Sequence, residues 1–153
     1  MSELTANDLQ LCRQVRVMCT CNQLRRTTRG VTQMYDAAMA SSGLKVTQLP
    51  ILVALGSAGD MPVTTLADAL ALDRTTLTRN LKVLEERGLV EMGEREDDAR
   101  VRMVSLTPSG SAALTGALAR WEDVQLAVEE GFGEQRLRAL YDELAALSEI
   151  VGV

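Results

Sequence analysis

The three cysteines of the chain lie within ten residues of one another, at Cys12, Cys19 and Cys21. Cys12 directly precedes Arg13, and Cys21 lies four residues before Arg25. Neighbouring cations favour thiolate chemistry, including oxidation and the capture of soft metals or metalloids. An odd number of cysteines in one short window is a poor disulfide framework for a secreted protein. Reduced thiols are therefore expected, either as sensors or as small side chains that fill an interface.

A second group of chemically capable side chains lies between Asp73 and Gly88. If this segment is a helix, Leu77, Leu81 and Leu84 form one inward stripe at spacings i, i+4 and i+7. The opposite face then carries short hydroxyls and long cations, namely Thr75, Thr78, Arg79 and Lys82. Side chains of these types read base edges and hold phosphates. Asp73 is the expected N-cap, and Gly88 is the expected stop.

Histidine is absent from the 153 residues, and no glycine-rich phosphate loop or pair of carboxylates beside an apolar stretch stands out. The lack of histidine excludes His-based metal sites, a Ser-His-Asp triad and a histidine general base within this chain. We therefore expect a protein that is not an enzyme and that requires no cofactor.

The net charge of −5 is unevenly distributed along the chain. Residues 12–48 hold six bases and one acid, whereas residues 111–153 hold three bases and eight acids. Such asymmetry indicates either an electrostatic footprint on one part of the molecule or two solvated helix faces of opposite sign. The first residues lack the blocks of a signal peptide, and no run of about 18 apolar residues occurs. A cytoplasmic protein without membrane contact is expected.

Helical patterns dominate the chain. It has only four aromatic residues, so its core must be built mainly from Leu, Val, Ala and Met, which favours helices. One long helix is predicted over about 7–40, with Gly43 as its stop and Gly30 as the point where it bends or weakens. A second helix is predicted over 47–57, with Thr47 as its cap. A short helix and turn over 63–72 lead into the helix that begins after Asp73.

Two strands are predicted next, over 89–92 and 100–106, joined by a turn that contains Gly93 and the charged run 94–98. Thr107 and Pro108 then form a strong helix-start signal, as N-cap and first helical residue. Two further helices are predicted, over 109–130 and 134–150, separated by the segment 131–133.

This order of elements resembles the MarR family of winged helix-turn-helix transcriptional regulators. The resemblance covers nearly the whole chain, and the five segments that carry it are Leu66-Ala-Asp-Ala-Leu70, Thr75-Thr-Leu-Thr-Arg79, Leu84-Glu-Glu-Arg-Gly-Leu-Val90, Asp98-Ala-Arg100 and Leu106-Thr-Pro-Ser-Gly110. A helix-turn-helix pattern alone is weakly specific. Its combination with an Asp-x-Arg turn and a strand that ends in Leu-Thr-x-x-Gly is much more specific.

The resemblance implies a mainly α fold with a small β-hairpin wing. It implies one domain over 1–153, with a DNA-binding lobe over 46–108 and dimerisation helices over 7–45 and 109–153. The implied partners are a second copy of the chain and a pseudo-palindromic operator in double-stranded DNA. The leucines of the last two helices exceed what a small winged helix would cover, so they pack on the first helix, on a partner, or on both.

For function, the resemblance implies a repressor that a small-molecule, oxidant or thiol-reactive signal releases from its operator. The expected DNA-binding residues are Arg74, Thr75, Thr76, Thr78, Arg79, Lys82, Arg95, Arg100 and Arg102. By resemblance, Arg100 reaches toward the minor groove or the backbone, and Asp98 orients nearby arginines. The alternative is that Asp98 and Arg100 only close the turn by a salt bridge. A winged-helix protein-interaction module without specific DNA binding is the alternative function.

The nature of the release signal stays open. A bound small-molecule effector and a thiol-bound metalloid at Cys12, Cys19 and Cys21 are both compatible with the sequence. In one straight helix no two of these thiols can bond or share an ion. A cross-link would need a second chain, another segment or a broken helix start. Cys12 resembles the sensing position of a hydroperoxide-responsive branch of the family, but the paired tyrosines of that branch are missing from the segment 46–49.

Overall fold

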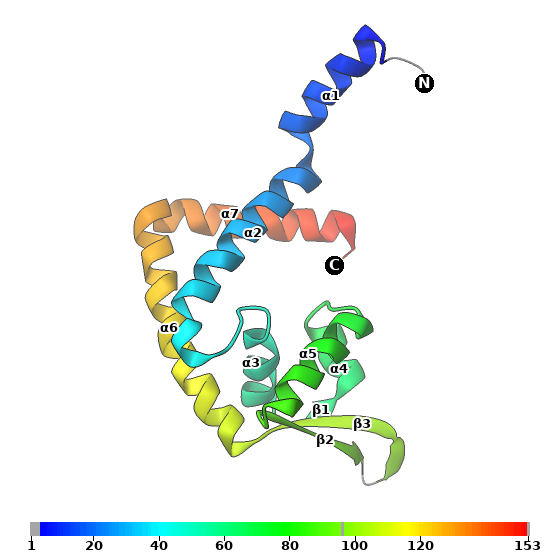
Figure 1. The fold of residues 1–153 in the computed structure, drawn as a ribbon, viewed down its shortest axis with the longest axis vertical. Coiled ribbons are helices and arrows are strands. Elements are labelled where there is room, and N and C mark those ends of the chain that lie inside the picture. Colours follow the sequence, from blue (N-terminus) through cyan, green and yellow to red (C-terminus); the bar gives the residue numbers. More distant parts are fainter. Residues whose placement is uncertain (1–3, 96, 153) are drawn as a thin grey trace. The chain divides into compact units, whose positions relative to one another are not determined.

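The computed structural model describes residues 4–95 and 97–152, which form two compact units that meet between Met34 and Tyr35. Each unit is described by itself, and Figure 1 gives the order of the elements along the chain. Most of the described residues are helical, and one small sheet accompanies the helices. Within the described ranges, no helix combines the length and the apolar character needed to cross a membrane.

The first unit contains α1 (Ala6–Met18) and most of α2 (Thr20–Ala38). The prediction of one continuous helix over 7–40 is wrong, because the helix breaks at Cys19, whose φ of −66° and ψ of 106° are extended. The side chain of Gln23 compensates for the break by donating to the carbonyl of Val17 at 2.8 Å. Gly30, the predicted weak point, lies inside α2 without interrupting it.

The start of α1 is encoded locally by a capping box. The Asp8 backbone N–H donates to the Thr5 hydroxyl at 3.2 Å, and the Thr5 backbone N–H donates to the Asp8 carboxylate at 2.8 Å. These bonds satisfy donors that a helix start otherwise leaves unpaired. Neither α1 nor α2 contains a buried residue.

The second unit holds the hydrophobic core, to which α3 (Leu49–Ala58), α4 (Val63–Ala69), α5 (Arg74–Glu86), the sheet and the next helix along the chain, α6 (Pro108–Phe132), contribute buried residues. The short helix η1 (Ala40–Ser42) contributes none, although Met39 and Leu44 on either side of it are buried. The largest fully buried side chains of the core are Met39, Leu44, Ile51, Leu52, Leu66, Leu77, Leu84 and Val104. The predicted start of α3 at residue 47 is wrong by two residues, because the helix begins at Leu49. The N-cap is Gln48 rather than Thr47, and it makes no side-chain cap bond.

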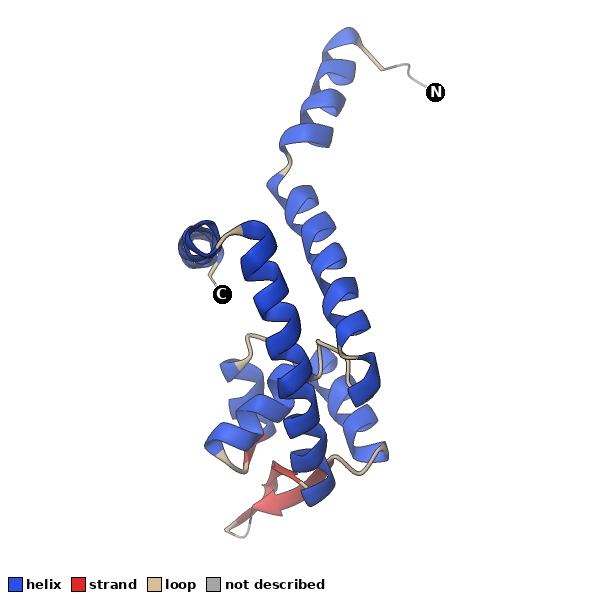
Figure 2. Ribbon diagram, turned by 90° about the vertical axis from the view of Figure 1, so that its left-hand side faces the viewer, coloured by secondary structure: helices blue, strands red, loops and turns tan. Residues whose placement is uncertain are grey.

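The sheet has three antiparallel strands in the order β1-β3-β2, formed by Met61–Pro62, Asp98–Leu106 and Val90–Arg95 respectively. The predicted hairpin is present, and β1 is an additional strand that pairs Met61 with Val104. Figure 2 shows the strands lying beneath the helices of this unit. The hairpin turn is tighter than predicted, because Gly93, Glu94 and Arg95 belong to β2, and Asp98 begins β3. Glu96, part of the predicted turn, lies outside the described residues.

The last two helices are α6 (Pro108–Phe132) and α7 (Glu134–Val151), close to their predicted bounds. Thr107 caps α6 as predicted, accepting from the Gly110 N–H at 2.9 Å. Gly110 must be small, because a Cβ there would collide with the carbonyl of Leu89. The two helices meet at Gly133, whose φ is +93° (Figure 1).

Two of the leucines for which packing inside the chain and packing on a partner were both open are buried in the single chain. Leu114 and Leu137 are only 9% and 6% exposed. The apolar side chains of α6 and α7 that stay at least 37% exposed are Leu118, Trp121, Leu126, Phe132, Leu140, Tyr141, Leu144, Ile150 and Val151. A bond from the Tyr35 hydroxyl to Gln125 Oε1 at 2.7 Å, and one between Gln125 Nε2 and the Tyr141 hydroxyl at 3.2 Å, join the end of α2 to both helices.

Candidate nucleic-acid interface

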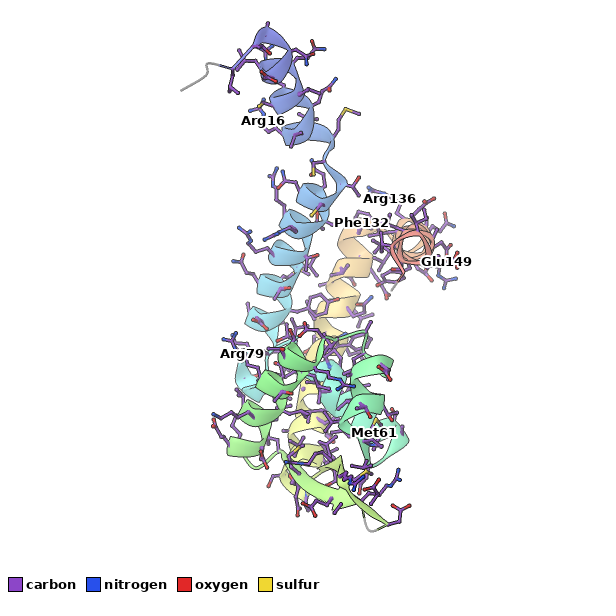
Figure 3. All side chains as sticks on the ribbon, turned by 90° about the vertical axis from the view of Figure 1, so that its right-hand side faces the viewer. Arg16, Met61, Arg79, Phe132, Arg136 and Glu149 are labelled. Carbon is purple, nitrogen blue, oxygen red and sulfur yellow. The ribbon has the colours of Figure 1, made fainter. Side chains whose placement is uncertain are left out.

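The helix α5 has one covered face and one open face. Leu77, Leu81 and Leu84 are 0%, 3% and 0% exposed, which confirms the predicted inward stripe. The open face carries Thr75, Thr78, Arg79 and Lys82, all of them exposed. Arg79 is labelled on this helix in Figure 3. An open helix face of hydroxyls and cations has the size and the chemistry to enter a major groove.

Asp73 builds the first turn of α5. Its carboxylate accepts from the backbone N–H of Thr76 at 2.8 Å and from the Thr76 hydroxyl at 2.6 Å. These bonds, the side-chain one first, hold the pKa of Asp73 below its usual value. The Thr76 hydroxyl proton is therefore committed to the cap, and only the oxygen lone pairs of this predicted DNA contact remain available. Arg74 and Thr75, in the same turn, are exposed.

The cations of the open face are weakly held. Lys82 lies 3.9 Å from Glu86, and both side chains are mostly exposed. A pair of this kind contributes under about 1 kcal/mol, so a phosphate would readily replace the carboxylate. Arg79 makes no ion pair with any described residue.

The three wing arginines differ in their surroundings, although all are exposed. Arg95 pairs with Asp97 at 2.6 Å, which the sequence did not predict. Arg102 faces Glu94 across the β2–β3 pair. Neither Arg100 nor Arg102 forms an ion pair within the described parts of the chain.

Asp98 has a backbone role in the wing. Its carboxylate accepts from the Arg100 N–H at 3.0 Å. The alternative of a turn-closing salt bridge between the two side chains is wrong, because the carboxylate bonds the backbone of Arg100 and leaves the guanidinium exposed. Asp98 therefore shapes the chain at the position from which Arg100 projects.

A groove of about 550 Å³ borders the open face of α5 and was not predicted from the sequence. Thr76 and Arg79 line it from α5, and Lys45 and Pro50 line it from the start of α3 and the preceding residues. These residues are distant in the sequence, so only the packing of α3 against the helix-turn-helix brings them together.

The cysteines occupy different local environments. Cys12 and Cys21 are exposed on α1 and α2, and Cys19 is half-buried at the break between them. The geometric argument from a straight helix therefore does not apply across Cys19. Within the described residues, no three cysteine, aspartate or glutamate side chains are grouped closely enough to hold a metal ion.

Comparisons with known proteins place these features in a family context. The MarR family model matches residues 42–101, which include α3 to α5 and most of the wing. The Mycobacterium tuberculosis transcriptional regulator MosR, solved in complex with DNA, is 35% identical; the match covers 88% of this chain and 99% of that chain, with a TM-score of 0.76.

Two further relatives differ in what they support. An organic hydroperoxide resistance transcriptional regulator of Bacillus subtilis is 30% identical over 91 residues, which are 60% of this chain and 62% of that protein. A mutant of Escherichia coli MarR in complex with operator DNA is 18% identical, covering 88% of this chain and 96% of that one, with a TM-score of 0.78. At that identity the likeness concerns the fold.

Proposed function

The chain belongs to the MarR family of transcriptional regulators, and from this premise we propose that it is a homodimeric repressor that binds a pseudo-palindromic operator in double-stranded DNA. The observation that carries the proposal is the open face of α5, which presents Thr75, Thr78, Arg79 and Lys82 opposite a fully buried leucine stripe. In this proposal α5 reads base edges in the major groove, and its flanking cations hold phosphates.

The wing supplies the second contact. Arg100 and Arg102 are exposed cations on β3, and Asp98 fixes the backbone of Arg100. A narrow minor groove concentrates negative potential, which favours an inserted guanidinium. Arg95 contributes less in this proposal, because its 2.6 Å pair with Asp97 is much closer than the 3.9 Å Lys82–Glu86 pair and must be broken before Arg95 can hold a phosphate.

The proposed dimer is supported by the apolar side chains that the single chain leaves exposed on α6 and α7. Trp121 is 40% exposed, Leu126 is 52% exposed and Leu140 is 40% exposed. Exposed apolar surface of this kind marks an interaction face. Two copies related by a twofold axis would present two α5 helices to half-sites about 34–36 Å apart.

Two routes of release are proposed. In the first, an oxidant or a soft electrophile reacts with Cys12 or Cys21, whose thiols are exposed. In the second, a small molecule occupies the groove beside Arg79 and displaces the operator. The first route acts by leaving the two α5 helices no longer matched to successive grooves, and the second by blocking the α5 face directly.

The test is a binding titration with the full-length chain and a DNA fragment from upstream of its own gene, repeated at several salt concentrations. We expect affinity to fall steeply with salt, and Arg79→Ala to lose about 1–3 kcal/mol of discrimination. Arg138→Ala, which removes an equal charge from an exposed pair on α7, is the matched control and should bind like the wild type. Salt-insensitive or absent binding would leave the protein-interaction module as the better function.

The release routes are separated in the same assay. A thiol oxidant or trivalent arsenic should release DNA from the wild type, and a triple Cys12→Ser, Cys19→Ser, Cys21→Ser chain should bind DNA and ignore both reagents. If that triple variant responds to every effector as the wild type does, the thiols only pack, and the small-molecule route remains.

A further inference from the structure

The connection between α2 and α3, residues 39–48, is held in place by side chains. The Leu44 N–H donates to the Ser42 hydroxyl at 3.2 Å, and the Lys45 N–H donates to Gln48 Oε1 at 3.1 Å. Met39 and Leu44 are 0% and 1% exposed. Because several of its backbone N–H groups are paired and its apolar side chains lie in the core, this connection is a fixed part of the second unit.

Asp36, in the last turn of α2, holds the later half of the connection. Its Oδ1 accepts from the Val46 N–H at 2.8 Å, and its Oδ2 lies 3.4 Å from Lys45 Nζ. The Lys45 side chain is 65% exposed, so the ion pair is weak, and the part-buried hydrogen bond to the backbone is the stronger tie.

Arg87, at the end of α5, holds the earlier half. Its Nη1 donates to the carbonyl of Gly43 at 2.9 Å, across 44 residues of sequence. Gly43 has a φ of +70°, and a Cβ on it would lie 3.1 Å from Arg87 Nη2. A glycine therefore both adopts the left-handed turn and leaves room for the guanidinium.

From these hydrogen bonds we infer that residues 39–48 form a rigid connection, here called the strut, through which Asp36 and Arg87 position α5. Both are therefore positioning residues for DNA binding. The inference rests on the proposed function of α5. Hydrogen bonds to base edges tolerate only a few tenths of an ångström, so a small shift of α5 moves Thr75 and Arg79 out of reach. Neither Asp36 nor Arg87 contacts DNA in this scheme.

Asp36→Ala and Asp36→Asn separate positioning from charge. Asparagine loses the charge but keeps an oxygen that accepts from the Val46 N–H, whereas alanine loses both. We expect Asp36→Ala to weaken operator affinity about 2- to 30-fold and Asp36→Asn to bind nearly as the wild type does. Each variant is compared with the wild type by helical circular dichroism at a temperature well below unfolding.

Arg87→Ala completes the test, with Arg87→Lys as its charge-matched control. Because both ties hold one strut, the losses of Asp36→Ala and Arg87→Ala should combine less than additively, while Asp36→Asn and Arg87→Ala should add. Three results would overturn this inference and leave the proposed function standing. They are additive losses of affinity, wild-type affinity in both alanine variants, and an Asp36→Asn loss equal to that of Asp36→Ala. A wild-type chain that fails to bind DNA would overturn the proposed function and this inference together.

Discussion

The helices α1 and α5 carry the same apolar pattern and have opposite surroundings. Each is 13 residues long and places three apolar side chains at i, i+4 and i+7. In α5 these are Leu77, Leu81 and Leu84, at 0%, 3% and 0% exposure. In α1 they are Leu11, Val15 and Met18, at 50%, 59% and 75% exposure. Periodicity therefore identifies the apolar face of a helix and says nothing about what covers it.

The apolar face of α1 is exposed in the single chain. A helix of 13 residues is marginal in water without tertiary packing. Its capping box fixes where it starts, but capping does not replace a covered face. We propose that a second copy of the chain covers this face in the homodimer, so that the folding of α1 would depend on assembly whereas that of α5 would not.

The largest effect tests the covered helix. Leu77→Ala should lower the free energy of unfolding by about 2–5 kcal/mol, because it leaves a cavity in the core. Val15→Ala, measured at a concentration too low for dimers, should cost under about 1 kcal/mol, since the side chain is already in water. Urea unfolding of both variants gives the comparison, and similar losses would contradict the difference between the two helices.

The next effect tests the uncovered helix at high concentration. Leu11→Ala should raise the dimer dissociation constant about tenfold or more, because it removes an apolar side chain from the proposed interface. Leu9→Ala is the matched control, since Leu9 lies on the opposite side of α1 and is 45% exposed. Sedimentation equilibrium measures both. Equal changes in the two variants would show that the Leu11 stripe is not the covered face.

Much of the second unit was predictable because its signals are local. The Asp73 cap, the Gly88 stop and the Thr107-Pro108 start each lie within a few residues of the structure they specify. The open face of α5 follows from the same short segment, so its candidate residues could be chosen from the sequence.

The rest depends on contacts between distant segments. Met61 and Pro62 form a strand only because Val104 and Met103 lie beside them. The break at Cys19 has no glycine or proline to announce it. The ties of Asp36 and Arg87 to the α2–α3 connection join residues that no spacing rule relates. Contacts between residues far apart in the chain decide such features, and a single sequence does not show which distant residues will meet.

A smaller effect is expected on the salt dependence of DNA binding, which distinguishes a cation of the wing from a cation of α1. Arg100→Ala should weaken binding to all DNA sequences alike and lower the salt slope by about one unit, if the wing holds a phosphate or enters the minor groove. Arg13→Ala removes an equal charge from α1 and should leave the slope unchanged. A reduced slope in both variants would mean that α1 also contacts DNA, while a loss of thermal stability alone in Arg100→Ala would leave the wing arginine a structural role.

The smallest effect concerns the caps, which pair a threonine with an aspartate at both helix starts. Hydrogen bonds from Thr5 and from Thr76 lower the pKa values of Asp8 and Asp73 below the ordinary 3.8. A lowered carboxyl pKa stabilises the folded form above pH 3.8, and that stabilisation is lost as the pH falls through the folded-state value.

Both caps therefore weaken in acid, but the consequences should differ. The first turn of α5 should persist, because Leu77 still anchors it in the core, whereas the first turn of α1 should fray. Amide chemical shifts followed from pH 6 to pH 2 would show this. An asparagine side chain keeps an amide oxygen that can accept the same backbone N–H bond without titrating, so Asp8→Asn and Asp73→Asn should remove the pH dependence from their own helix only. Fraying of both helices at the same pH would mean that the covered stripe does not hold the start of α5.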